Sequence, residues 1–293
     1  MAITIPEIQS PQRRNRPQAP TTPGRMTLAS VTRGVAERPK RILIYGPEKV
    51  GKTSFAAGSL RPIFICAEDG FPRELAAKTE RFPEPQSWGD VLSAIASLTV
   101  DAHDFKTLVI DTLDWIEPLN HAWVCERGNK DDIESFGFGK GYVAALDDWR
   151  VFVAALERLR KAKGMDVILN AHSQIKTWKN PEGPDYERFS LKIHEKAAGL
   201  LKEWCDAVLF ARYEEFVNKD EQTKRNRGVS SGARIVHTTR TAAYDAGNRY
   251  NLPPVLPLSW PDFLAAVERG GQEVATLRTA IDEKLALIGD EAL

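Results

Sequence analysis

Residues 46–54 read GPEKVGKTS and follow directly on the apolar run RILIY, with the spacing GxxxxGK and then Thr. Glycines at the first and sixth positions let the backbone curl, so that successive N–H groups point inward at phosphate oxygens. Lys52 is then placed to reach the β- and γ-phosphates, and the Thr53 hydroxyl to bind Mg²⁺. The pattern predicts a site for ATP and Mg²⁺ made of Gly46, Pro47, Glu48, Lys49, Val50, Gly51, Lys52, Thr53 and Ser54.

Carboxylates follow two further apolar runs. PIFIC at 62–66 leads into Ala-Glu-Asp, where Glu68 is suited to polarising an attacking water as a general base, with Asp69 as the rival. The alternatives for Glu68 are a surface turn residue or a helix cap. The run KTLVID ends in Asp111, which would complete the Mg²⁺ site with Thr53. A helix-capping role is the alternative for Asp111, although Asp114 fits that role better.

A fourth apolar run has an unusually polar exit, VILNAHSQIK, which contains Asn170, His172, Ser173 and Gln174. An amide or imidazole at this place can touch the γ-phosphate and move when it leaves, which would pass the nucleotide state into the following loop. The alternative for His172 is a buried ring bonded to a backbone carbonyl, and Gln174 has a purely structural alternative too. The sequence leaves open which of the two senses the γ-phosphate.

The elements that must position these residues alternate along the chain. Short β-branched runs predict strands at 41–45, 62–66, 106–111 and 166–171, and helical patterns lie at 52–58, 88–98, 113–127 and 142–163. This order predicts an α/β fold with a mainly parallel central sheet and helices on both faces. Ligands of such sheets bind beyond the carboxyl ends of the strands, where the polar residues fall.

The later part of the chain has a different rhythm. A helix is predicted at 194–205, and strands at 207–213 and 233–239 are joined by a polar loop, 218–232, which suggests an antiparallel extension of the sheet. We expect three parts: a mobile basic Pro/Arg-rich arm at 1–38, an ATPase domain at 39–260 and C-terminal helices at 261–293.

Composition restricts the class of protein. The 293 residues carry 40 basic and 40 acidic side chains, so binding of nucleic acid by bulk charge is excluded and any contact must come from a local patch. Three widely spaced cysteines in apolar surroundings predict buried thiols rather than a disulfide framework or a zinc site. Neither a membrane span nor a signal peptide is indicated, so we expect a cytoplasmic protein.

The motifs together resemble a known family. GPEKVGKT, then AED, LVIDTLD, FGFGKGY and VILNAHSQIK are similar to the RecA-like P-loop ATPase core, most closely to its phage-encoded form. That form comprises phage AAA-domain nucleotide-binding proteins, including Sak-type single-strand annealing ATPases. The similarity extends over about residues 40–260 and includes the late stretch RTAAYDAGNRYNLPPVLPLSW.

The resemblance assigns roles to several residues. It implies that Lys52 and Thr53 bind phosphate and magnesium, Glu68 is the catalytic glutamate and Asp111 the Walker B acid. It makes Gln174 the start of a DNA-contacting loop. Related oligomers send a Lys-x-Arg pair into the neighbour's ATP site, but Gly247 stands where the lysine would be, so such a finger rests on Arg249 alone.

Two segments have the residues needed to bind single-stranded DNA, with cations for phosphates and flat rings for bases. The first, 131–142, and the second, 176–188, take the places of the family's two DNA loops. The alternative for each aromatic ring is that it anchors its loop to the domain. The candidate DNA-binding residues are Phe138, Lys140 and Tyr142 in the first segment and Lys176, Trp178, Lys179 and Arg188 in the second.

The sequence thus favours a DNA-dependent ATPase that acts on single-stranded DNA in phage recombination or replication, as a homo-oligomer in the bacterial host cytoplasm. A single-strand binding protein is a partner implied only by the resemblance. Two alternatives stay open: a hexameric helicase- or loader-type motor, and a nucleotide-gated interaction protein with little turnover.

Overall fold

The computed structural model describes residues 26–31, 38–68, 70–219 and 226–290. The chain divides into two compact units, residues 1–37 and 38–293. The described part of the first unit contains one short 3-10 helix, η1 (Leu28–Ser30). The arginines of the predicted basic arm, from Arg13 to Arg25, lie outside the described residues.

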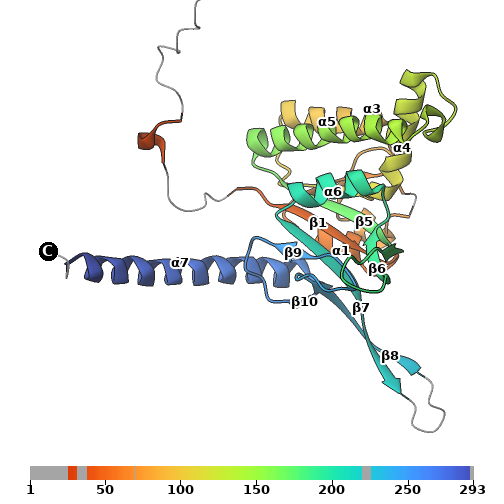
Figure 1. The fold of residues 1–293 in the computed structure, drawn as a ribbon. Coiled ribbons are helices and arrows are strands. Elements are labelled where there is room, and N and C mark those ends of the chain that lie inside the picture. Colours follow the sequence, from red (N-terminus) through yellow and green to blue (C-terminus); the bar gives the residue numbers. More distant parts are fainter. Residues whose placement is uncertain (1–25, 32–37, 69, 220–225, 291–293) are drawn as a thin grey trace, which may run out of the picture. The chain divides into compact units, whose positions relative to one another are not determined.

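A mainly parallel sheet forms the centre of the second unit (Figure 1). Its order is β10-β8-β7-β1-β5-β4-β2-β3, with β6 pairing with β5 and β9 pairing with β7. The strands are β1 (Arg41–Gly46), β2 (Pro62–Cys66), β3 (Glu80–Arg81), β4 (Thr107–Asp111), β5 (Asp166–Trp178), β6 (Tyr186–Leu191), β7 (Ala207–Lys219), β8 (Asn226–His237), β9 (Gly247–Asn248) and β10 (Val255–Pro257).

Helices cover both faces of this sheet (Figure 1). The larger layer packs on the sheet through Trp88, Trp149 and Phe152, and the opposite layer through Phe55 and Phe263. The first comprises α3 (Trp88–Val100), α4 (Leu113–Gly128), α5 (Lys140–Lys163) and α6 (Glu195–Trp204), and the second α1 (Lys52–Ala57) and the start of α7 (Trp260–Asp290); short helices α2 (Arg73–Ala76) and η2 (Glu134–Phe136) lie in connections.

The predicted architecture is confirmed. β1, β5, β4 and β2 are parallel neighbours and are buried along almost their whole predicted lengths, as their continuous apolar runs require. β7 continues the parallel set beside β1, while β8 and β10 form the antiparallel extension. Cys66, Cys125 and Cys205 are free and buried, as expected.

Three segments differ from the prediction. The polar segment 218–232 is not simply a loop, because β7 and β8 continue into it on both sides of residues 220–225, which lie outside the described residues. Segment 176–188 is the end of a β5–β6 hairpin rather than an irregular loop. The C-terminal region is one helix, α7, where several were expected.

Among the helices that the structure describes, none is both long and apolar enough to cross a membrane.

Candidate nucleotide-binding site

The loop at 46–51 joins the buried strand β1 to helix α1 and has an unusual backbone. Lys49 and Gly51 both have positive φ, 61° and 110°, so two residues of the loop lie in the left-handed region that favours glycine. At its entrance, Gly46 packs so closely on β7 that a Cβ built on it would lie 2.1 Å from the carbonyl oxygen of Ala211. The loop therefore depends on glycine at both its ends.

Lys52 places its ammonium inside this loop. Its Nζ donates to the carbonyl oxygens of Gly46 at 3.0 Å and Pro47 at 2.8 Å. Burial lowers the pKa of Lys52 to about 8, although Asp111, Asp114 and other carboxylates nearby oppose this effect. A cation held under a curled backbone, at the start of a helix, is suited to bind phosphate oxygens.

Asp111 ends strand β4 beside this loop and is bonded on both sides. Its Oδ2 accepts from the Thr53 hydroxyl at 2.9 Å, and its Oδ1 accepts from the Asn170 amide at 3.0 Å. The pairing of Ile110 with Leu169 sets β4 and β5 in the register that produces the second contact. Burial raises the pKa of Asp111, while the hydrogen bonds from Asn170 and Thr53 act in the opposite direction.

These oxygens fit a magnesium ion. Mg²⁺ takes hard oxygen ligands and is usually bound by one or two protein oxygens together with substrate phosphates. The hydroxyl of Thr53 and the carboxylate of Asp111 are already side by side at the loop that would hold the phosphates. Asn170, which the sequence indicated only as part of a polar exit, is the residue that orients the carboxylate.

Glu68 lies two residues beyond the end of β2, on the same edge of the sheet. Cys66, the last residue of β2, pairs with Asp111. Glu68 is half-buried and close enough to Lys52 to influence its pKa, so its carboxylate belongs to the same electrostatic site. Its rival, Asp69, lies outside the described residues.

His172 on β5 is paired with Gly46, the first residue of the loop. Asp114 on α4 accepts from the backbone N–H of His172 at 2.8 Å and contacts its Nδ1 at 2.8 Å. Asp114 fitted a helix-capping role better than Asp111 did, and its carboxylate also fixes the imidazole beside the loop. No sequence spacing indicates the pair, because it depends on how α4 packs on β5.

Gln174 is two residues further along β5, and its side chain is engaged elsewhere. Its Nε2 donates to the carbonyl oxygen of Leu191 on β6 at 2.8 Å. This bond joins the first pairs of the β5–β6 hairpin, where Ser173 lies opposite Leu191. In this conformation Gln174 therefore connects the strand end to the hairpin, and His172 is the side chain held beside the loop.

The first candidate DNA segment is partly built into the domain. Phe138 is fully exposed, with a φ of 50°, between Gly137 and Gly139, which are also left-handed. Lys140 begins α5 and is exposed. Tyr142 is anchored, because its ring stacks on His194 at 4.2 Å and its hydroxyl donates to Glu134. Phe138 and Lys140 thus stay available for a ligand.

The second segment presents one aromatic face. Trp178 is 41% exposed, near the end of β5, and Lys176 and Lys179 are exposed beside it. Lys179 also forms an ion pair with Asp185 in the turn.

Arg188 was expected to bind DNA, but its side chain is not available to a ligand. Its side chain is 1% exposed, its Nη2 contacts Asp245 Oδ1 at 2.7 Å, and its guanidinium lies 4.6 Å from the centre of the Trp178 ring. Arg188 is therefore better described as a support for Trp178.

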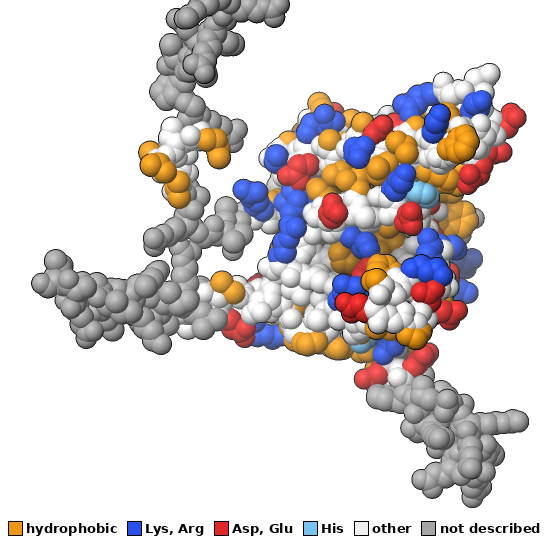
Figure 2. Space-filling model, viewed as in Figure 1, with side chains coloured by type: hydrophobic (Ala, Val, Ile, Leu, Met, Phe, Trp, Pro, Cys, Tyr) orange, Lys and Arg blue, Asp and Glu red, His pale blue; other side chains and the backbone are white. Residues whose placement is uncertain are grey.

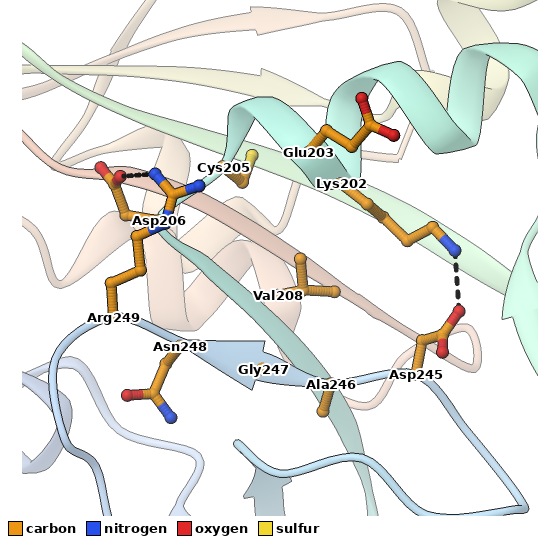
Figure 3. Close-up of a pocket in the computed structure, with 10 residues that line it drawn as sticks. All are labelled: Lys202, Glu203, Cys205, Asp206, Val208, Asp245, Ala246, Gly247, Asn248 and Arg249. Carbon is orange, nitrogen blue, oxygen red and sulfur yellow. Dashed lines mark hydrogen bonds and ion pairs between the residues drawn. The ribbon is translucent and has the colours of Figure 1, made fainter.

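Arg249 lies at the opposite edge of the sheet from the phosphate loop. It lines a cavity of about 420 Å³ and contacts Asp206 Oδ1 at 3.1 Å, while Lys202 contacts Asp245 across the same cavity (Figure 3). Asp206 also pairs with Arg41, the first residue of β1. The whole length of β1, about 17 Å, separates this edge from Gly46. Arg249 therefore does not reach the loop of its own chain.

A model of one protein family, described as AAA domain, matches residues 38–250. No curated protein matches the chain significantly. Among solved structures, the crystal structure of the RadB recombinase is similar to it, with 14% sequence identity, 68% of this chain and 80% of that chain covered, and a TM-score of 0.40. A similarity this low carries no argument about function.

Proposed function

The chain belongs to the family of AAA domains, a class of nucleotide-binding ATPase, and we propose that it is a RecA-like protein that hydrolyses ATP and acts on single-stranded DNA as an oligomer. The proposed setting is phage recombination or replication, by annealing or as a recombinase. One observation supports the proposed ATPase activity. At one edge of the sheet, Lys52 is bonded to the loop backbone at Gly46, and the neighbouring Thr53 is bonded to Asp111. The phage setting rests only on the resemblance of the sequence motifs to the phage-encoded form of the family.

The residues of the site divide the reaction between them. The backbone N–H groups of the loop and the ammonium of Lys52 would hold the phosphates, and Thr53 and Asp111 would hold Mg²⁺. When bound, this ion neutralises negative charge that develops on the transferred phosphoryl group. The carboxylate of Glu68 would accept a proton from the attacking water, whose oxygen bonds to the γ-phosphorus as the bond to the leaving ADP oxygen breaks.

Exposed side chains support the DNA part of the proposal. Phe138 and Trp178 offer ring faces for stacking, and Lys140 and Lys176 offer cations for the phosphate backbone. On the face in Figure 2, basic and acidic side chains are interspersed, so contact with DNA would rely on these local groups rather than on a uniform basic surface. The hairpin that carries Trp178 begins at Ser173, directly after His172, so one strand, β5, connects the nucleotide site to Trp178.

The position of Arg249 supports assembly. A cation that cannot reach its own phosphate loop is available to complete the site of a neighbour in a head-to-tail arrangement. Its side chain is 61% exposed, and one contact with Asp206 holds it at the sheet edge. Arg249 would then stabilise negative charge on the neighbour's ATP during hydrolysis.

The proposal is tested by measuring ATPase rate with and without single-stranded DNA, with particle size recorded in the same samples. We expect DNA to raise the rate in an oligomeric fraction, Lys52→Ala to abolish nucleotide binding and Glu68→Gln to keep binding but lose turnover. Glu84→Gln, an exposed glutamate substitution outside the site, is the control. Normal turnover in Lys52→Ala would refute the assignment of ATP hydrolysis to this loop.

The DNA part has its own test. Phe138→Ala and Trp178→Ala should weaken binding of a fluorescent oligothymidine, by about 1–3 kcal/mol for each stacked base. Trp115→Ala removes another exposed ring, on α4, and should leave binding unchanged. Equal affinity in all three variants would refute the assignment of these two segments to DNA.

A further inference from the structure

A second cation, which the proposed mechanism does not use, lies against the phosphate loop. Arg234 is an exposed residue of β8. A Cβ built on Gly51 would lie 2.8 Å from its Nη1 and 3.7 Å from Cδ2 of Leu258. The end of the guanidinium is therefore in contact with the loop backbone just before Lys52.

The sheet extension brings this arginine to the loop. Arg234 pairs with Tyr213 of β7, and the Tyr213 hydroxyl donates to the carbonyl oxygen of Lys49 at 3.3 Å. On its other side, the backbone N–H of Leu258 donates to the Arg234 carbonyl oxygen at 2.9 Å. One cross-strand pair thus touches the loop at Lys49 and at Gly51, its two residues with positive φ.

Within the described part of the chain, the positive charge of Arg234 is not balanced by an ion pair. Two arginines that follow it in the sequence each face a carboxylate, Arg240 facing Asp245 at 3.7 Å and Arg249 facing Asp206 at 3.1 Å. Among the described residues, no carboxylate forms an ion pair with Arg234. An exposed, unpaired guanidinium beside a curled row of backbone N–H groups is a favourable place for phosphate oxygens.

The position along the loop indicates which phosphates these are. Lys52 holds its ammonium against Gly46 and Pro47, at the start of the loop, and such a lysine reaches the β- and γ-phosphates. Arg234 contacts the opposite end of the loop, at Gly51, where the backbone leads into α1.

We infer that Arg234 binds the α- and β-phosphate oxygens of the nucleotide held by its own chain. The inference rests on the proposed nucleotide binding. It makes the β7–β8 hairpin part of the nucleotide site as well as of the sheet.

The test compares the affinities of the full chain for ADP and ATP by calorimetry in Arg234→Gln and Arg234→Lys. A charge-assisted hydrogen bond at this place predicts about tenfold weaker binding in Arg234→Gln, equal for ADP and ATP because the γ-phosphate is not involved. Arg234→Lys, which keeps the charge, should recover part of the loss. Arg158→Gln removes the same charge from an exposed position on α5, on the opposite helix layer, and should bind as the unmodified chain does.

The outcomes separate this inference from the proposed function. If the unmodified chain binds neither nucleotide, both are overturned. If it binds ADP and Arg234→Gln binds ADP equally well, only the role of Arg234 is overturned. Thermal unfolding of each variant adds a second measurement: a lower midpoint with unchanged affinity would make Arg234 a support of the hairpin, and would also overturn the inference.

Discussion

Gly46 is the position where one added methyl group should be most damaging. In Gly46→Ala the new Cβ would lie 2.1 Å from the Ala211 carbonyl oxygen and 3.0 Å from its carbonyl carbon. Carbon and oxygen atoms in close contact are normally about 3.3 Å apart or more, so β1 and β7 would have to separate by about 1 Å. Both residues are buried, and the atoms that the new Cβ would meet belong to the backbone of Ala211, so no flexible side chain can give way.

The magnitude follows from two costs. Overpacking a core costs about 1–3 kcal/mol, and weakening the backbone hydrogen bonds between the two strands adds about 1 kcal/mol for each bond. We therefore expect Gly46→Ala to be about 3 kcal/mol less stable in urea unfolding followed by tryptophan fluorescence, and to bind ADP more weakly because the loop begins at this residue.

The control is Gly199→Ala on α6, where a new Cβ would meet nothing within 4 Å. This substitution should be neutral or stabilise the chain by up to about 1 kcal/mol, because alanine favours helix over glycine. The close approach of β1 to β7 would be refuted if Gly46→Ala unfolded at the same urea concentration as Gly199→Ala and bound ADP normally.

Three further predictions concern partly buried carboxylates, each measured by urea unfolding. Burial raises the pKa of the Glu117 carboxyl from its ordinary value of 4.5 to about 7. The contribution of Glu117 to stability is therefore full below about pH 4.5 and is lost as the pH rises through about 7. Glu117→Gln should equal the unmodified chain near pH 4 and be about 3 kcal/mol more stable at pH 8; parallel pH curves would contradict this. Burial acts to raise the pKa of Asp114, but hydrogen bonds from His172 outweigh it and lower the pKa, so its contribution is present above about pH 4 and lost as pH falls. Asp114→Asn should be about 1–3 kcal/mol less stable at pH 7, with the difference narrowing in acid; a constant difference would count against the His172 contact. Asp245→Ala leaves the guanidinium of Arg188 buried and unpaired and should cost about 3–5 kcal/mol, and a cost no larger than for a surface carboxylate would contradict the burial of Arg188.

The parts of the site that the sequence predicted all lie at strand ends. Parallel strands with apolar runs must end at one edge, so Lys52, Thr53, Asp111 and Glu68 could be brought together from their positions alone. The four central strands follow from their short apolar runs, and the loop follows from the spacing of its glycines and lysine. The structure supports this grouping through the bond between Thr53 and Asp111.

The contacts that the sequence did not predict join elements far apart in the chain. The burial of Arg188 depends on Asp245, and the approach of Arg234 to Gly51 depends on how far β7 and β8 extend. Neither contact is indicated by the spacing of its residues in the sequence. The β5–β6 hairpin is different, because Asn180, Pro181, Gly183 and Pro184 between two runs with aromatic residues are a turn signal that was present in the sequence.

The separation of Arg249 from its own phosphate loop has a consequence for mixtures of chains. Lys52→Ala would lack a working loop but keep its arginine, and Arg249→Ala would keep the loop but lack the arginine. If the arginine of one chain completes the loop of the next, two inactive preparations should regain activity when combined. Random head-to-tail assembly of equal amounts would restore about a quarter of the interfaces, each with an intact loop facing an intact arginine. Activity that arises only on mixing would show that Lys52 and Arg249, at opposite edges of one sheet, act together across the interface between two chains.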